Sequence, residues 1–315
     1  MLPGSIRPAF GLAYLLCRYA DTIADTALLP AERRIYWIEK FPQIVRGQNA
    51  TAGASLSNEL TGTSDNPYEA VLITHLAACL DALNLINPAQ KNFIYDVVDA
   101  VCEGMKIDLQ TFPNQKNAAP AAFKTPQDLM HYCRLMGGKP GLFWSQLIAQ
   151  STRITLPETR FFELGQQIGD GLQIVNILRD LSKDLQNGRC YFAQTDLQQN
   201  QLSPRDLLNK QNYQKFIPVQ KKWIAWGKQN LQSAFEYYRA IPKKSWRIRA
   251  AVAWPVLWTA DTFAKLNGSP DLLNPHKRIK ISRLRIYATI LLTPFFVISN
   301  RVFSKWLNHK LSALP

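Results

Sequence analysis

Apolar residues along this chain recur mainly at spacings of three and four, which is typical of amphipathic helices packed into a bundle. In chain order, the predicted helices cover 8–26, 30–45, 68–85, 89–109, 126–137, 141–151, 157–186, 216–238 and 246–266. Small polar residues fill 47–66, which predicts a surface loop with at most a short helix, and 112–125 also predicts a loop. We therefore expect an all-α protein built as a single-domain helical bundle.

The predicted helix at 157–186 carries a polar stripe on an otherwise apolar surface. Asp180 and Asp184 are four residues apart, so both carboxylates leave the same face, and Gln173 and Asn176 extend that face by the same spacing. Apolar residues cover most other directions, and like charges one turn apart are unfavourable inside a protein without a counter-charge. Mg²⁺ would supply that charge, since it is usually held by one or two carboxylates together with substrate phosphates.

Arginines flank this acidic pair. Arg179 and Arg189 offer planar, multi-donor groups that suit phosphate oxygens. An isolated D-x-x-x-D is more often a solvated helix face with ion pairs one turn apart. A second copy of the motif would favour the metal site instead.

The second copy lies near the start of the chain. Tyr14, Arg18, Asp21 and Asp25 are spaced four, three and four apart, so they share one face of the first predicted helix. Two such helices, facing each other across a cavity, can hold Mg²⁺ ions on a diphosphate. That arrangement is needed to ionise an allylic diphosphate, because metals and arginines stabilise the charge on the departing pyrophosphate.

Both motifs resemble those of the squalene and phytoene synthase family, the head-to-head prenyl synthases. Arg7–Asp25 resembles the first aspartate-rich helix of the family, and Leu172–Tyr191 resembles the second. In a third block, Tyr132 and Gly141 match, whereas residues 135–137 and 139–140 depart from the family pattern. The resemblance covers roughly residues 5 to 270 and implies an isoprenoid synthase-type bundle with a central active-site cavity.

The resemblance also implies a reaction in two stages. One farnesyl diphosphate ionises and alkylates a second to form presqualene diphosphate, which ionises again and rearranges. The implied metal ligands are Asp21, Asp25, Asp180 and Asp184; the implied catalytic residues are Tyr14, Asp21, Tyr132 and Asp180; and the implied substrate-binding residues are Arg18, Gln173, Asn176, Arg179 and Arg189. The tyrosine of the family at the position of Tyr132 is implicated in steering the carbocation and the first proton loss.

The motif wording predicts squalene as the product, with Mg²⁺ as cofactor and NADPH left open as hydride donor. Phytoene, dehydrosqualene and hydroxysqualene formation stay open as alternatives. So does a catalytically impaired, membrane-associated protein that binds prenyl diphosphates, which the altered third block and the apparent lack of the N-terminal helix of the family both favour.

Charge and cysteine content narrow the partners and the compartment. The net charge of +14 suits an anionic partner, but no recognisable RNA or DNA module accompanies it, so we expect no nucleic acid. Five cysteines without a C-x-x-C pair favour reduced cytosolic thiols, and the chain opens without a secretory signal pattern. We expect a monomer.

The end of the chain has a different pattern. Residues 277–285 are strongly basic, and the apolar run Ile286–Ile298 is shorter than the roughly 20 residues of a spanning helix. We therefore predict an isoprenoid synthase domain at 1–270 and a tail at 271–315 that lies on the inner face of the cytoplasmic membrane. The residues expected in the apolar layer are Phe295, Phe296, Phe303 and Trp306. Packing of the tail onto the bundle is the alternative.

Overall fold

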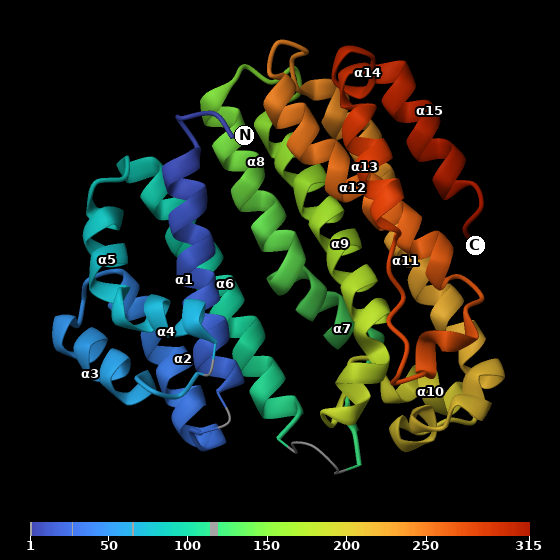
Figure 1. Ribbon diagram of the computed structural model, residues 1–315, viewed down its shortest axis with the longest axis horizontal. Coiled ribbons are helices and arrows are strands. Elements are labelled where there is room, and N and C mark those ends of the chain that lie inside the picture. The colour runs from blue at the N-terminus through green and yellow to red at the C-terminus, as the bar shows by residue number, and fades with distance from the viewer. Residues whose placement is uncertain (1, 27, 65, 114–118) are drawn as a thin grey trace. The chain divides into compact units, whose positions relative to one another are not determined.

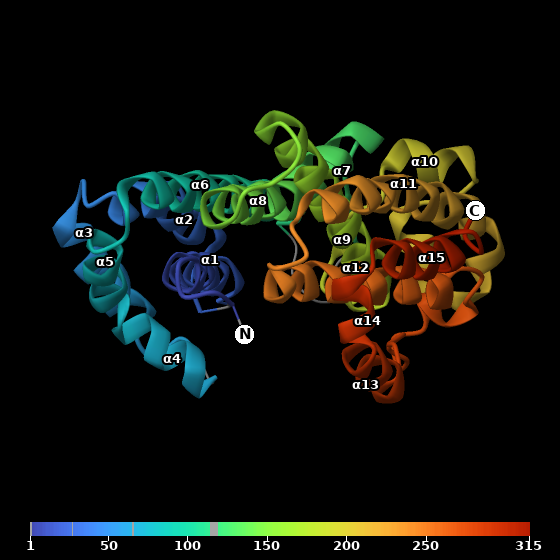
Figure 2. The ribbon, with the colours of Figure 1, turned by 90° about the horizontal axis from the view of Figure 1, so that it is seen from above.

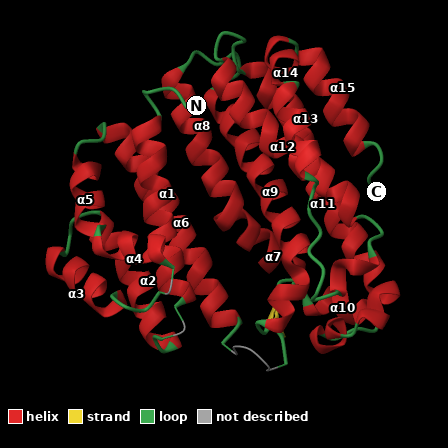
Figure 3. Cartoon of the chain, in the orientation of Figure 1, coloured by secondary structure: helices red, strands yellow, loops and turns green. Residues whose placement is uncertain are grey.

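The computed structural model describes residues 2–26, 28–64, 66–113 and 119–315. Helices dominate these residues (Figure 3), so the predicted all-α class is confirmed. The chain divides into two compact units. The N-terminal unit comprises Pro3–Pro113, and the C-terminal unit comprises Asn114–Pro315 together with Met1–Leu2.

The N-terminal unit is built around α1 (Figure 1), which packs on α2 and α6. Its helices are α1 (Arg7–Asp25), α2 (Ala31–Val45), α3 (Ala50–Leu60), α4 (Pro67–Thr74), α5 (Leu76–Asn84) and α6 (Pro88–Thr111). Tyr19 of α1 stacks on Phe41 of α2 with ring centroids 5.3 Å apart. The predicted buried stripe of α2, which is Trp37, Ile38 and Phe41, is confirmed.

Two predictions for this unit need correction. The predicted loop at 47–66 contains α3, because Asn49 caps its start by accepting a hydrogen bond of 3.1 Å from the Ala52 amide, and Leu56 is fully buried. The predicted single helix at 68–85 is two helices, α4 and α5, separated at His75. The His75 ring nitrogen Nδ1 lies 2.8 Å from the Val71 carbonyl oxygen, one turn earlier.

The C-terminal unit is arranged around α9, which packs on α8, α11 and α12. Its elements are β1 (Ala121–Ala122), α7 (Pro126–Cys133), the π-helical turn η1 (Arg134–Gly138), α8 (Lys139–Ser151), α9 (Glu158–Gln186), β2 (Arg189–Cys190), α10 (Gln194–Gln199), the short 3-10 helices η2 (Pro204–Leu208), η3 (Lys210–Asn212) and η4 (Pro270–Leu273), α11 (Tyr213–Ala240), α12 (Trp246–Leu266), α13 (Arg283–Leu291), α14 (Thr293–Ile298) and α15 (Asn300–Leu311). The α9 helix ends where predicted, since Gly188 follows with φ of 78°, a left-handed conformation that favours glycine. The strands β1 and β2 then pair in parallel, with Ala121 opposite Arg189.

The predicted helix break at Gly137-Gly138 is absent. The chain instead continues from α7 through η1 into α8. The glycines serve close packing: a Cβ atom on Gly137 would lie 2.3 Å from the Gly169 carbonyl oxygen, and one on Gly141 would lie 2.2 Å from that of Gly165. Glycine is therefore required here because the backbones of two neighbouring helical segments touch.

The tail packs onto the C-terminal unit as α13, α14 and α15, which contact α12. Phe296 and Phe303 are fully buried, so their predicted place in a membrane layer is wrong and the packing alternative holds for them. Phe295 is 61% exposed, while Trp306 is half-buried with its ring 5.0 Å from that of Phe296. The tail thus belongs to the compact C-terminal unit, and a functional boundary at residue 270 stays a prediction. Among the described residues, none of the helices combines the length and apolar character that a membrane crossing requires.

Candidate active site

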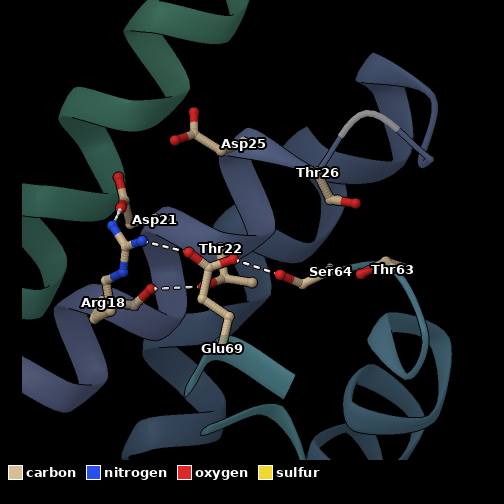
Figure 4. A pocket seen from close by; sticks show the side chains of 8 residues that line it. All are labelled: Arg18, Asp21, Thr22, Asp25, Thr26, Thr63, Ser64 and Glu69. Carbon is tan, nitrogen blue, oxygen red and sulfur yellow. Dashed lines mark hydrogen bonds and ion pairs between the residues drawn. The ribbon is translucent and has the colours of Figure 1, made fainter. Parts of the chain in front are cut away.

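In the N-terminal unit, α1 holds Arg18 between two carboxylates (Figure 4). Arg18 donates through one terminal nitrogen to Asp21, three residues later, and through the other to Glu69 of α4. The Arg18 and Asp21 side chains are 40% and 34% exposed, so the pair is reachable from solvent. The predicted polar face of α1 therefore contains an oriented guanidinium group.

Glu69 is a residue of this site that the sequence analysis missed. It accepts a hydrogen bond of 2.6 Å from the Ser64 hydroxyl and one of 3.3 Å from the Asn66 amide. The Ser64 hydrogen bond, followed by the hydrogen bond and charge of Arg18, keeps the pKa of Glu69 below its ordinary value. Its sequence signal is weak, because a glutamate in the first turn of a helix such as α4 is common.

A small cavity adjoins this network. Its volume is ≈ 170 Å³, and its lining consists of Arg18, Asp21, Thr22, Asp25, Thr26, Thr63, Ser64 and Glu69. In Figure 4 the Asp25 carboxylate points away from Arg18, whereas Asp21 points toward it. Tyr14 is 63% exposed and does not line this cavity. The structure thus brings together three of the four predicted α1 residues.

In the C-terminal unit, the predicted polar stripe of α9 is present. Gln173, Asn176, Asp180 and Asp184 are all half-buried on a helix whose other positions are mostly buried. Arg179 forms a two-pronged ion pair with its neighbour Asp180, donating from Nε at 3.1 Å and from Nη2 at 2.5 Å. This arginine is therefore held beside the acidic pair, as the sequence predicts.

A second arginine reaches Asp180 from the tail. Arg278 donates a hydrogen bond of 3.3 Å to Oδ1 of Asp180. Burial acts to raise the pKa of Asp180, but the hydrogen bonds and charge of Arg179, together with Arg278, outweigh it and lower the pKa below its ordinary value. The sequence analysis assigned the basic run that contains Arg278 to lipid headgroups, and for this residue the structure shows a different contact.

A larger cavity lies beside α9, between that helix, α12 and the segment that precedes α13. Its volume is ≈ 400 Å³, and its lining consists of Val175, Asn176, Arg179, Pro255, Trp258, Thr259, Thr262, Arg278, Lys280, Ile281 and Ile286. Three cationic side chains face it together with apolar ones, so it can accommodate an anionic group attached to an apolar chain. Asn176 and Arg179 are the predicted site residues in this lining, and Gln173, Asp184 and Arg189 are not part of it.

Tyr132 lies elsewhere in the C-terminal unit, within an aromatic cluster. Its side chain is only 6% exposed, and its ring centroid is 5.7 Å from that of Phe123 and 5.0 Å from that of Tyr191. Arg189, which is half-buried, belongs to β2 just before Tyr191. The pairing of β2 with β1 therefore fixes the backbone next to this cluster.

The donor set of the two acidic pairs fits Mg²⁺. Each pair offers two carboxylates, and the side chains of Asp21 and Asp180 are 34% and 24% exposed, so they are accessible to an ion that keeps several of its waters. In the part of the chain that the structure describes, His, Cys, Asp and Glu side chains do not gather in groups of three or more that could hold a metal. A site that joins both pairs on one diphosphate stays a prediction, since the pairs belong to different compact units.

Comparisons with known proteins agree with the motifs. A family model described as squalene/phytoene synthase matches residues 1–285. The 4,4'-diapophytoene synthase of Staphylococcus haemolyticus is 26% identical over 213 residues, covering 67% of this chain and 61% of that protein. The squalene synthase of Schizosaccharomyces pombe is 24% identical over 280 residues, covering 89% of this chain and 58% of that protein. The chain therefore spans less than two thirds of the length of these relatives.

Solved structures share the fold. The complex of TcSQS with the ligand BPH1237 superposes with a TM-score of 0.75 at 17% identity, covering 99% of this chain and 92% of that one. The squalene synthase HpnC of Alicyclobacillus acidocaldarius gives a TM-score of 0.58 at 18% identity, covering 84% and 83%. The helical fold is thus of the squalene synthase type, and because the family model covers most of the sequence, this chain belongs to the squalene/phytoene synthase family.

Proposed function

We propose that this protein condenses two farnesyl diphosphates head to head, through presqualene diphosphate, to squalene in a Mg²⁺-dependent reaction. Members of its family are prenyltransferases of isoprenoid synthesis. The observation that carries the proposal is a repeated arrangement: Arg18 is ion-paired with Asp21, and Arg179 with Asp180. In each motif an arginine is therefore oriented beside the carboxylates that would hold the metal.

The two acidic pairs, Asp21 with Asp25 and Asp180 with Asp184, would together hold Mg²⁺ on the diphosphate. When bound, the metal supplies positive charge that stabilises the departing pyrophosphate. In this proposal Arg18, Arg179 and Arg189 donate to phosphate oxygens, and the side-chain amides of Gln173 and Asn176 bind the same substrate.

Two tyrosines complete the proposed site. The Tyr132 ring is held by Phe123 and Tyr191, so its electron-rich face is available to a carbocation while its own orientation is restricted. Tyr14 is exposed on the face of α1 that carries Arg18 and Asp21, and it would contact substrate from there. NADPH is the proposed hydride donor of the last step.

Mg²⁺-dependent pyrophosphate release from farnesyl diphosphate tests this proposal. Asp180→Asn should lower the rate by at least about a hundredfold, because it removes charge from the site of pyrophosphate departure. Glu163→Gln is the matched control on the same helix, since the Glu163 side chain is 63% exposed and pairs only loosely with Arg160 at 3.4 Å. Equal rates for wild type and Asp180→Asn would remove the metal assignment.

The nature of the product needs a separate measurement. Similarity to a 4,4'-diapophytoene synthase favours dehydrosqualene as the second candidate. Products from farnesyl and geranylgeranyl diphosphate, each with and without NADPH, separate squalene from dehydrosqualene, phytoene and hydroxysqualene. Diphosphate binding without any turnover would identify an impaired binding protein instead.

We also propose that the protein acts as a monomer on the inner face of the cytoplasmic membrane. Support comes from the basic character of the tail and from the exposed apolar residues that it keeps after packing, such as Phe295. A lipid surface would supply the prenyl substrate and accept the apolar product.

A further inference from the structure

We propose that one exposed surface of the C-terminal unit, formed by α13, α14 and the start of α15, binds a membrane that contains anionic lipids. This inference deepens the membrane association proposed above by assigning it to particular residues. It is tested without substrate, so that its failure and a failure of the proposed condensation can be told apart.

The outer sides of α13 and α14 expose large apolar residues. Leu284 and Leu291 are each 78% exposed, and Tyr287 between them is 63% exposed; their spacing of three and four places them on one face of α13. On α14, Phe295 and Ile298 are 61% and 65% exposed. Five large apolar side chains within fifteen residues of sequence exceed the scattered exposure that is normal for a protein surface.

These side chains are exposed although the helices themselves are anchored. On their inner sides, Thr289, Phe296 and Val297 are buried, and Trp254 of α12 donates a hydrogen bond of 2.9 Å to the Thr293 hydroxyl. Figure 2 shows α13 and α14 lying beyond α12, on the side away from α11. The apolar face is therefore carried by fixed helices and lies at the outside of the unit.

Charge selects an anionic lipid surface as the occupant. No aspartate or glutamate occurs in residues 272–315, which contain eight lysines and arginines: Lys277, Arg278, Lys280, Arg283, Arg285, Arg301, Lys305 and Lys310. Four of these form ion pairs with Asp180, Asp261 or Asp271, whereas Lys280, Arg283, Arg301 and Lys305 are exposed. Basic residues beside an exposed apolar face are the combination that binds acidic membranes.

A basic cavity adjoins this face and suits a lipid phosphate. It has a volume of ≈ 520 Å³ and is lined by Arg239, Lys243, Ser299, Asn300, Arg301 and Ser304. Its lining begins one residue after the exposed Ile298 and contains three cations, two hydroxyl groups and one amide, but no carboxylate. A phosphate in this cavity would receive charge-assisted hydrogen bonds while acyl chains meet the apolar side chains. A second copy of the same face is disfavoured, because two basic surfaces repel each other.

Cosedimentation of the full-length protein with phosphatidylcholine vesicles, with and without phosphatidylglycerol, tests the apolar part of the surface. We expect binding only to the anionic vesicles, and a loss of at least about tenfold in partitioning for Leu291→Ser/Phe295→Ser, since apolar burial contributes to such binding. Leu28→Ser/Leu85→Ser is the matched control, because these leucines of the N-terminal unit are 68% and 88% exposed. Equal partitioning of the two double variants overturns the proposal.

A second pair of variants tests the basic cavity. Lys243→Gln/Arg301→Gln should bind anionic vesicles about twentyfold more weakly, at about fivefold per removed charge. Lys210→Gln/Lys221→Gln removes two exposed lysines from other elements and should leave binding nearly unchanged. Equal loss in both variants would indicate net charge alone and would overturn the assigned surface. A change in oligomeric state of Leu291→Ser/Phe295→Ser in size-exclusion chromatography would also overturn it, in favour of a second protein copy.

Discussion

Arg278 donates a hydrogen bond of 3.3 Å to Asp180, so a residue of the basic tail contacts the first aspartate of the acidic motif on α9. Both side chains are partly exposed, at 57% and 24%. The segment before α13 is therefore part of the α9 site as well as a connection to the end of the chain.

Arg278→Gln should lower kcat/KM for pyrophosphate release about tenfold, because a charged hydrogen bond beside the acidic pair is lost. The pKa of Asp180 should move up toward its ordinary value, since Arg278 is one of the charges that lower it. Lys277→Gln is the neighbouring control, because Lys277 pairs with Asp271 instead. Unchanged kinetics in Arg278→Gln would show that the contact has no part in the reaction.

Glu69→Gln should weaken the orientation of Arg18 and raise KM for farnesyl diphosphate by about tenfold. The reason is that Glu69 is the partner that reaches Arg18 from another helix, α4. Glu59→Gln, which removes a comparable ion pair with Arg33, serves as the control and should leave KM unchanged.

The same carboxylate has an expected pH dependence. Because the pKa of Glu69 is lowered in the folded protein, its contribution to stability is present above the unfolded value of about 4.3 and is lost as pH falls through the lowered folded value. The stability difference between wild type and Glu69→Gln in denaturant titrations should therefore shrink only below about pH 4. A difference that shrinks between pH 7 and pH 5 would contradict the lowered pKa.

Gly137→Ala should destabilise the protein by about 2 kcal/mol or more, because the added Cβ meets a backbone oxygen that has no flexible side chain to move. Gly11→Ala is the matched helical control, since nothing lies within 4 Å of a Cβ at that position. The control should be neutral or up to about 1 kcal/mol more stable, because alanine favours helix over glycine. Urea unfolding of both variants makes the comparison, and similar stabilities would refute the close backbone contact.

Asp261→Asn should destabilise the C-terminal unit by about 3–5 kcal/mol, since it removes the partner of a buried cation. Lys310 is only 5% exposed and donates to Asp261, which also receives two hydrogen bonds of 3.2 Å from Arg285. Asp271→Asn breaks an exposed pair and should cost less than about 1 kcal/mol. Thermal unfolding distinguishes the two variants, and equal midpoints would mean that this network does not hold the tail.

The local patterns were predictable from sequence. The stripe of α9 and the face of α1 both follow from spacings of three and four, because every residue involved lies on one helix. The cap at Gly188 was predictable for the same reason. Such features depend on neighbours within a few residues of the chain.

Contacts between distant segments were not predictable in this way. Glu69 lies 51 residues from Arg18, and Arg278 lies 98 residues from Asp180, so no spacing rule connects them. Phe296 and Phe303 have an apolar pattern that suits a membrane or a protein core equally, and only their packing on the bundle decides between the two. At Gly137 the sequence indicated flexibility, whereas the position actually requires a small residue.

The π-helical turn η1 constrains the length of the chain. Such a turn arises when one extra residue is accommodated within a continuous helix. Deleting a residue from 134–138 would restore a regular helix but rotate its two ends relative to each other by about 100°. Either Tyr132 would lose its place beside Tyr191, or Gly141 would lose its place against Gly165, so a shortened variant cannot keep both the aromatic cluster and the glycine contact.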